Sequence, residues 1–153
     1  VYYSYTGNTE IIAKTLAQEL NADILKIEDV ERPSVLKAYI LGTFAARKGK
    51  SWPIKSINTD LSKYNRIFVG APIWCGKTSP ELNTFIDQTD FSGKSVVIFV
   101  SMAGSNPDMA IKALDTRISA RGGKIISSFS IKTVMSKKND IELKSKDAAQ
   151  QYK

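Results

Sequence analysis

Short apolar runs recur along the chain, and amphipathic stretches lie between them. The runs predict five strands, which are Val1 to Tyr5, Ala22 to Ile27, Arg66 to Ala71, Ser95 to Val100 and Lys124 to Lys132. Strands that alternate with helices favour a parallel sheet that is covered by helices on both of its faces. We therefore expect residues 1–153 to form a single doubly wound α/β domain with three layers.

The helices are predicted from apolar periodicity and from residues that start or stop helices. Ser79 and Pro80 are typical of an N-cap and a first helical position, and Gly122 with Gly123 is typical of a helix end. Inward-facing positions are expected at Ile12, Ala13, Leu16, Ala17, Leu20, Leu82, Phe85 and Ile86. The other helices are expected at Pro33 to Ala46, from Asn106 to Gly122, and at Asp140 to Tyr152.

Composition excludes several kinds of site. The chain has no histidine and one cysteine, which excludes an intrachain disulfide, His-based triads and the common zinc sites, so we expect no metal. No apolar run is long enough to cross a membrane. We expect a cytoplasmic protein, although the sequence begins at Val1 inside a predicted strand and leaves an upstream leader open. Redox or transfer chemistry would have to come from a bound cofactor.

The turn after the first predicted strand has the composition of an anion-binding loop. It reads Ser4-Tyr5-Thr6-Gly7-Asn8-Thr9, in which Ser4, Thr6 and Thr9 offer hydroxyl donors around Gly7. A helix that begins here directs unpaired amides and the positive end of its dipole toward the loop. Because the loop has no lysine or arginine, it favours a small phosphate monoester over a nucleoside triphosphate. An ordinary helix N-cap is the alternative.

Two further loops are expected at the same edge, because open parallel sheets bind ligands beyond the carboxyl ends of their strands. One reads Pro72-Ile73-Trp74-Cys75-Gly76-Lys77-Thr78 and offers an indole on which a planar ligand can stack. The other reads Ser101-Met102-Ala103-Gly104-Ser105-Asn106 and can present backbone groups to the edge of a ring. A surface aromatic and a plain connection are the corresponding alternatives.

The first loop resembles the phosphate loop of the flavodoxin family, and Gly70-Ala71-Pro72-Ile73-Trp74-Cys75-Gly76 is similar to that family's second loop. The resemblance covers nearly the whole chain and implies a five-stranded parallel sheet in the order 2-1-3-4-5. It also implies non-covalent FMN, with Trp74 against the isoalloxazine and the peptide around Gly76 near flavin N5. The phosphate would be bound by Ser4, Thr6, Asn8 and Thr9.

The function that this resemblance implies is that of an FMN-binding redox protein. The protein would be an electron carrier or a small reductase linked to NAD(P)H or a quinone. Its charge departs from that of typical acidic flavodoxins, because the net charge is +7 and Lys77 follows Gly76. This difference favours an acidic redox protein or an anionic small-molecule acceptor as partner. Nucleic acid is not expected, because the basic stretches carry no recognisable binding motif.

Other chemistries can be compared with the same strand ends. Ala71 to Thr78 satisfies a loose Walker A pattern, but its central residues are too bulky or rigid to wrap phosphates, and no Walker B aspartate follows a strand. A receiver domain needs an aspartate where the third strand ends in Ala71. A low-molecular-weight phosphatase needs an arginine six positions after Cys75, where Glu81 stands. A domain that has lost flavin and acts as a non-catalytic binding module stays open as an alternative.

Overall fold

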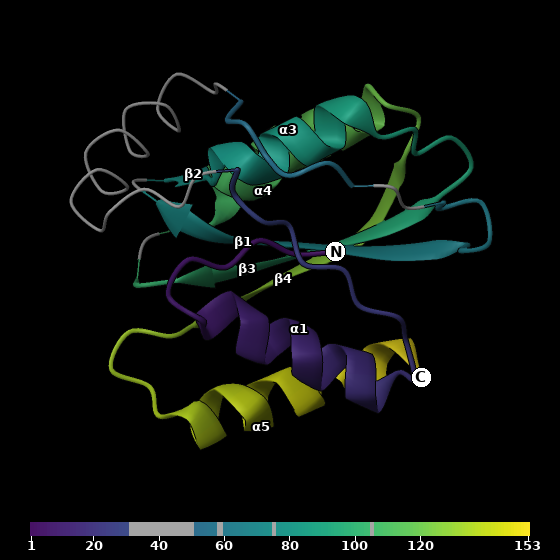
Figure 1. Ribbon diagram of the computed structural model, residues 1–153. Helices are drawn as coiled ribbons and strands as arrows, with labels where there is room; N and C mark the ends of the chain where they lie inside the picture. The colour runs from purple at the N-terminus through teal and green to yellow at the C-terminus, as the bar shows by residue number, and fades with distance from the viewer. Residues whose placement is uncertain (31–50, 58–59, 75, 105) are drawn as a thin grey trace.

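A sheet built from the apolar runs lies between two layers of helices, as Figure 1 shows. Helices α1 (Asn8–Glu19) and α5 (Lys138–Ala149) cover one face of the sheet. Helices α3 (Pro80–Gln88) and α4 (Asp108–Ser119) cover the other face. A 3-10 turn, η1 (Gln150–Tyr152), follows α5. The predicted three-layer α/β arrangement is therefore confirmed.

The computed structural model describes residues 1–30, 51–57, 60–74, 76–104 and 106–153. The predicted helix from Pro33 to Ala46 lies outside the described residues. Cys75 and Ser105, each within a predicted loop, lie outside them as well.

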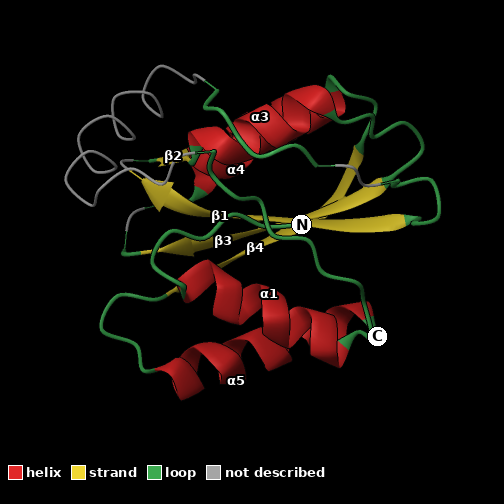
Figure 2. Cartoon of the chain, viewed as in Figure 1, coloured by secondary structure: helices red, strands yellow, loops and turns green. Residues whose placement is uncertain are grey.

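The named strands form one mixed sheet, drawn in yellow in Figure 2. They are β1 (Arg66–Trp74), β2 (Lys77–Thr78), β3 (Ser95–Met102) and β4 (Lys124–Lys132). Their order is β2-β1-β3-β4, and β1, β3 and β4 run parallel. The two-residue β2 pairs antiparallel with the end of β1. The prediction of Lys124 to Lys132 as a strand is confirmed, and β3 extends two residues beyond its predicted end.

The first two predicted strands are shorter than expected. Tyr2 alone forms parallel bridges, to Lys26 on one side and to Gly70 on the other. Its amide donates to the Leu25 carbonyl at 3.0 Å, and its carbonyl accepts from the Ile27 amide at 2.8 Å. The pairing ends there because the next residues turn away into the first loop. The sequence predicts an all-parallel sheet of five full strands. Among the described residues, the structure has instead the four named strands and these bridges of Tyr2.

The core fills both faces of the sheet. On one face, alternate residues of β1 pack under α3 and α4, where Leu82 and Ile86 are fully buried. On the other face, Phe99 packs with residues of α1 and α5. Gly70 makes this possible, because a Cβ there would lie 2.0 Å from Cζ of Phe99. The Phe99 ring therefore occupies the space that a side chain at Gly70 would need.

Candidate functional site

The first loop ends at the N-terminus of α1, as the sequence predicts. Ser4 Oγ accepts hydrogen bonds from the amides of Gly7 and Glu10, each at 3.2 Å. Gly7 has a φ of 96°, a left-handed conformation that glycine adopts at little cost. Within the described part of the chain, no hydrogen bond uses the amides of Asn8 or Thr9. These amides, with the helix dipole, suit an anion that is bound from outside the loop.

The hydroxyl groups of this loop take different roles. Thr6 is exposed, so its hydroxyl is available to a ligand. Thr9 is 1% exposed, and its Oγ1 lies 2.8 Å from Oγ of Ser101, the residue before the last of β3. The structure therefore brings the first and third predicted loops together at this contact. In this arrangement the Thr9 hydroxyl holds the two loops together, whereas the sequence had suggested it as a phosphate ligand.

The second predicted loop is mostly a β-hairpin. Strand β1 continues through Trp74, and Trp74 pairs with Lys77 across the turn, where Gly76 has a φ of 78°. The sequence predicts a strand that ends at Ala71, whereas β1 continues past Pro72, a residue that has no amide to donate. The Gly70 amide points toward the first segment and donates to the carbonyl of Val1. The nitrogen of Pro72, two residues further along β1, points to the same side, where the first segment has already turned away. The missing amide therefore costs no ladder hydrogen bond there.

Trp74 belongs to the hairpin, and its side chain contacts the first loop. Its ring meets Tyr3 edge-on at 6.1 Å between centroids and Tyr5 at 6.2 Å. The indole is partly buried, so part of its surface is open to a ligand. Because Lys77 is its cross-strand partner, the two side chains project from the same face of the hairpin. The third loop contributes Ala103 and Gly104, which are both exposed.

A cavity of about 430 Å³ lies beside the first loop. One wall is formed by the loop itself, from Ser4 to Gly7. The other walls come from charged residues that the sequence analysis did not select, namely Glu10, Lys26, Glu28, Asp29 and Lys55. Three of these, Lys26, Glu28 and Asp29, follow or end the second predicted strand. The rule that ligands bind at carboxyl ends of strands could have identified them.

Ion pairs neutralise most of the charge around this cavity. Lys26 Nζ and Glu10 lie 2.7 Å apart, as do Lys55 Nζ and Glu28. Hydrogen bonds from Lys14 and Lys26 lower the pKa of Glu10, and the one from Lys55 lowers the pKa of Glu28. Both carboxyl groups are therefore ionised at neutral pH, and each has a cationic partner.

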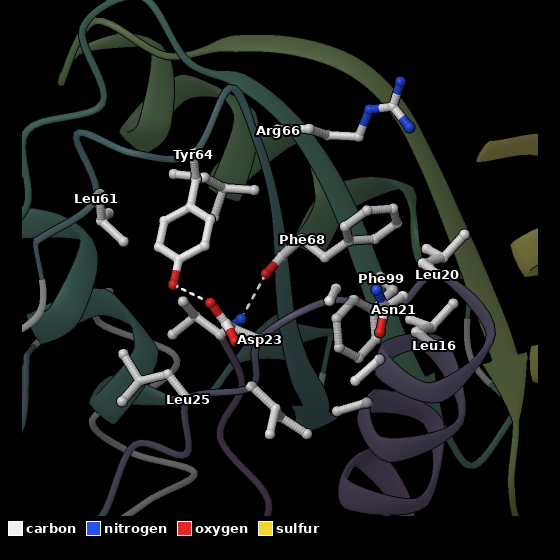
Figure 3. A pocket seen from close by; sticks show the side chains of 16 residues that line it. Leu16, Leu20, Asn21, Asp23, Leu25, Leu61, Tyr64, Arg66, Phe68 and Phe99 are labelled. Atoms are coloured by element: carbon white, nitrogen blue, oxygen red, sulfur yellow. Dashed lines mark hydrogen bonds between the residues drawn. The ribbon is translucent and has the colours of Figure 1, made fainter. Parts of the chain in front are cut away.

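A separate cavity of about 520 Å³ lies at the other end of the sheet (Figure 3). It is lined by apolar side chains from the end of α1 and the start of β1, including Leu20, Leu25 and Phe68. Tyr64 donates a hydrogen bond to Asp23 at its rim. The cavity is larger than the one beside the first loop, but none of the predicted loops lines it.

The described residues restrict the kinds of site and segment that this part of the chain can form. They hold no group of three or more acidic, cysteine or histidine side chains that could bind a metal ion. None of the described helices combines the length and hydrophobicity that a bilayer crossing requires. The arrangement at the carboxyl edge offers free amides, hydroxyl groups and an indole, which are groups that can bind and orient a ligand.

Comparison with known proteins identifies the family. The flavodoxin family model matches residues 43–141, so the chain belongs to the flavodoxin family. A flavodoxin of Nostoc sp. is 28% identical over 138 residues, which cover 84% of this chain and 67% of that protein. The chain thus spans about two thirds of the length of this relative.

Solved structures show the same fold. A flavoprotein of Bacteroides uniformis has a TM-score of 0.78 and 25% identity, covering 93% of this chain and 92% of its own. A flavoprotein of Lactobacillus acidophilus, solved in complex with FMN, has a TM-score of 0.73 and 22% identity over 84% of this chain and 89% of its own. The flavodoxin-like α/β fold expected from the sequence is confirmed.

Proposed function

We propose that this protein binds FMN non-covalently at the carboxyl edge of the sheet and works as a redox protein, either an electron carrier or a small flavin-dependent reductase. The observation that carries the proposal is the assembly of the three loops. The Thr9–Ser101 contact joins the first loop to the third, and the Tyr5–Trp74 contact joins the first to the second. An anion site and an aromatic face therefore lie side by side, which suits a phosphate joined to a planar ring.

The residues present fit the phosphate of FMN. The amides of Asn8 and Thr9 and the exposed hydroxyl of Thr6 are the donors at the start of α1. The Ser4 oxygen accepts two amide hydrogen bonds, which fix the loop, and its own proton is left to donate outward. A Cβ at Gly7 would meet nothing within 4 Å, so the backbone is open on the side from which a ligand approaches.

The remaining residues would position the ring. FMN supplies the electron-transfer chemistry when it is bound. Trp74 is held by Tyr3 and Tyr5 and would present its free surface to the isoalloxazine. The hairpin turn at Gly76 would place a peptide beside the ring edge, and the exposed Ala103 and Gly104 would close the opposite side.

Two finer features belong to the same proposal. The first is the strand order 2-1-3-4-5, in which the numbers count the five predicted strands along the chain. The parallel bridges of Tyr2 join the first predicted strand to the second at Lys26 and to the third, β1, at Gly70, and β3 and β4 continue the parallel sheet as the fourth and fifth. Net charge +7 supports an acidic redox protein or an anionic small molecule as the partner.

The test is a titration of the purified protein with FMN. We expect the flavin fluorescence to be quenched with a 1:1 end point, and the isolated complex to be yellow and to release FMN on denaturation. A protein that leaves FMN fluorescence unchanged and stays colourless would favour the non-catalytic binding module.

A further inference from the structure

Two buried polar atoms at the start of α3 have no hydrogen-bond partner among the described residues. They are Ser79 Oγ and Glu81 Oε2. Ser79 is 0% exposed and Glu81 is 4% exposed. Burial disfavours the ionised form of a carboxylate, whereas a protonated carboxyl group is tolerated much better. The environment of Glu81 is therefore one that retains a proton.

The neighbours of Glu81 act on its pKa in both directions: Asp29 raises it, whereas hydrogen bonds from the backbone and from Tyr3 lower it, and burial with Asp29 outweighs these donors. In the described part of the chain, the titratable groups that act on Glu81 are Asp29, at the end of the second segment, and Tyr3, in the first. The Tyr3 hydroxyl lies 3.2 Å and 3.3 Å from the two carboxylate oxygens of Asp29, to which it donates. Burial raises the pKa of Glu81 to about 7, and the negative charge of Asp29 contributes to the rise. Burial and the two carboxylates also raise the pKa of Tyr3, which stays a donor.

Of this acidic pair, Asp29 lines the cavity beside the first loop and Glu81 does not. Tyr3 lines the same cavity. The lysines of that cavity are in ion pairs with Glu10 and Glu28, and no ion pair of the described residues includes Asp29. When Glu81 loses its proton, a second negative charge joins that of Asp29 near the cavity that Ser4, Thr6 and Gly7 of the first loop also line.

We propose that Glu81 is a proton-binding residue of the FMN site, which is protonated when the phosphate is bound and whose ionisation weakens phosphate binding. This inference rests on the proposed function. Because linkage is reciprocal, FMN binding near neutral pH takes up protons at Glu81. Asp29 couples the two, since its charge raises the pKa of Glu81 and it lines the cavity.

The main experiment measures the dissociation constant of FMN between about pH 6 and pH 8.5, a range centred near the titration of Glu81. Because the second ionisation of the FMN phosphate, near pH 6, acts equally on every variant, the linkage is measured as a difference between proteins: relative to Glu81→Gln, the affinity of the parent should fall by about tenfold across this range, which is typical of coupling between sites. Glu81→Gln mimics the protonated group and should retain high affinity throughout. Riboflavin, which has no phosphate, should show little change with pH in either protein.

Glu28→Gln is the matched control. Glu28 lines the same cavity but is exposed and paired with Lys55, so it stays ionised over the whole range. Its substitution should leave the slope of affinity against pH as in the parent. Asp29→Asn is a second test. Removing the negative charge of Asp29 should reduce the slope of FMN affinity against pH. Equal slopes in the parent and in Glu81→Gln would overturn the inference.

A second measurement does not depend on flavin. The pKa of Glu81 is raised in the fold from its ordinary 4.5 to about 7. The free energy of unfolding without FMN should therefore decrease as the pH rises from about 4.5 to 7 and then level off. The decrease should be absent in Glu81→Gln. If this decrease is seen but neither protein binds FMN, the proposed function fails and the proton site stands; if FMN binds with equal slopes, only the linkage fails.

Discussion

Thr9 Oγ1 and Ser101 Oγ lie 2.8 Å apart in the interior, and this contact joins the start of α1 to the end of β3. Replacing Thr9 by valine keeps the shape of the side chain and leaves the Ser101 hydroxyl without its partner. We expect a loss of about 1–3 kcal/mol in the free energy of unfolding, because a buried polar group is left unsatisfied. Urea denaturation measures this loss.

Thr116→Val is the control for this substitution. Thr116 is an exposed threonine of α4 whose hydroxyl bonds only to its own helix at Lys112. Its replacement should change stability by less than about 0.5 kcal/mol. Equal effects of the two substitutions would show that the Thr9–Ser101 contact does not hold the loops together.

Trp74 is expected to stack on the bound flavin. Flavin fluorescence should therefore be quenched in the complex, and Trp74→Ala should raise the fluorescence and weaken binding by removing the aromatic contact. Trp52→Phe is the control, since Trp52 lies outside the loops of the site and its backbone amide bonds to Thr84. A Trp74→Ala protein with unchanged affinity and unchanged quenching would assign the indole a purely structural role.

Lys77 projects from the same face of the hairpin as Trp74, so its charge should act on a ring that lies there. At an effective dielectric near 20, one charge at about 6 Å contributes roughly 3 kcal/mol before screening. Lys77→Glu should therefore lower the midpoint potential of bound FMN, and the difference from the parent should shrink at high salt. Potentiometric titration at two salt concentrations measures it, and equal potentials at low salt would place the ammonium in bulk solvent.

The sequence was sufficient to predict local features of the site. Ser4 to Thr9 is predicted to be an anion loop because a strand, a glycine and a helix start follow one another within a few residues. The Thr9–Ser101 contact joins positions 92 residues apart, so no local pattern indicates it. From the sequence alone, Glu81 is noted only because it lies at the position where a low-molecular-weight phosphatase needs arginine. Its burial beside Asp29 depends on the packing of α3 against two distant segments.

The hairpin of β1 and β2 shows a second limit of local reasoning. A proline normally indicates that a strand has ended, yet β1 continues past Pro72 to Trp74. Whether a proline interrupts a strand depends on which side of the strand its missing amide faces. That side is known only when the neighbouring segments have been placed.

The central claim is that the start of α1 binds the phosphate of FMN. The most direct test compares FMN and riboflavin binding to the parent and to Thr6→Ala, with exposed Thr116→Ala as the control. A hydrogen bond to a charged group contributes about 1.5–3 kcal/mol, so FMN affinity should fall by about 10- to 150-fold. Riboflavin affinity should stay as in the parent. An equal loss for both ligands, or no loss for FMN, would contradict the assignment of the phosphate to this loop.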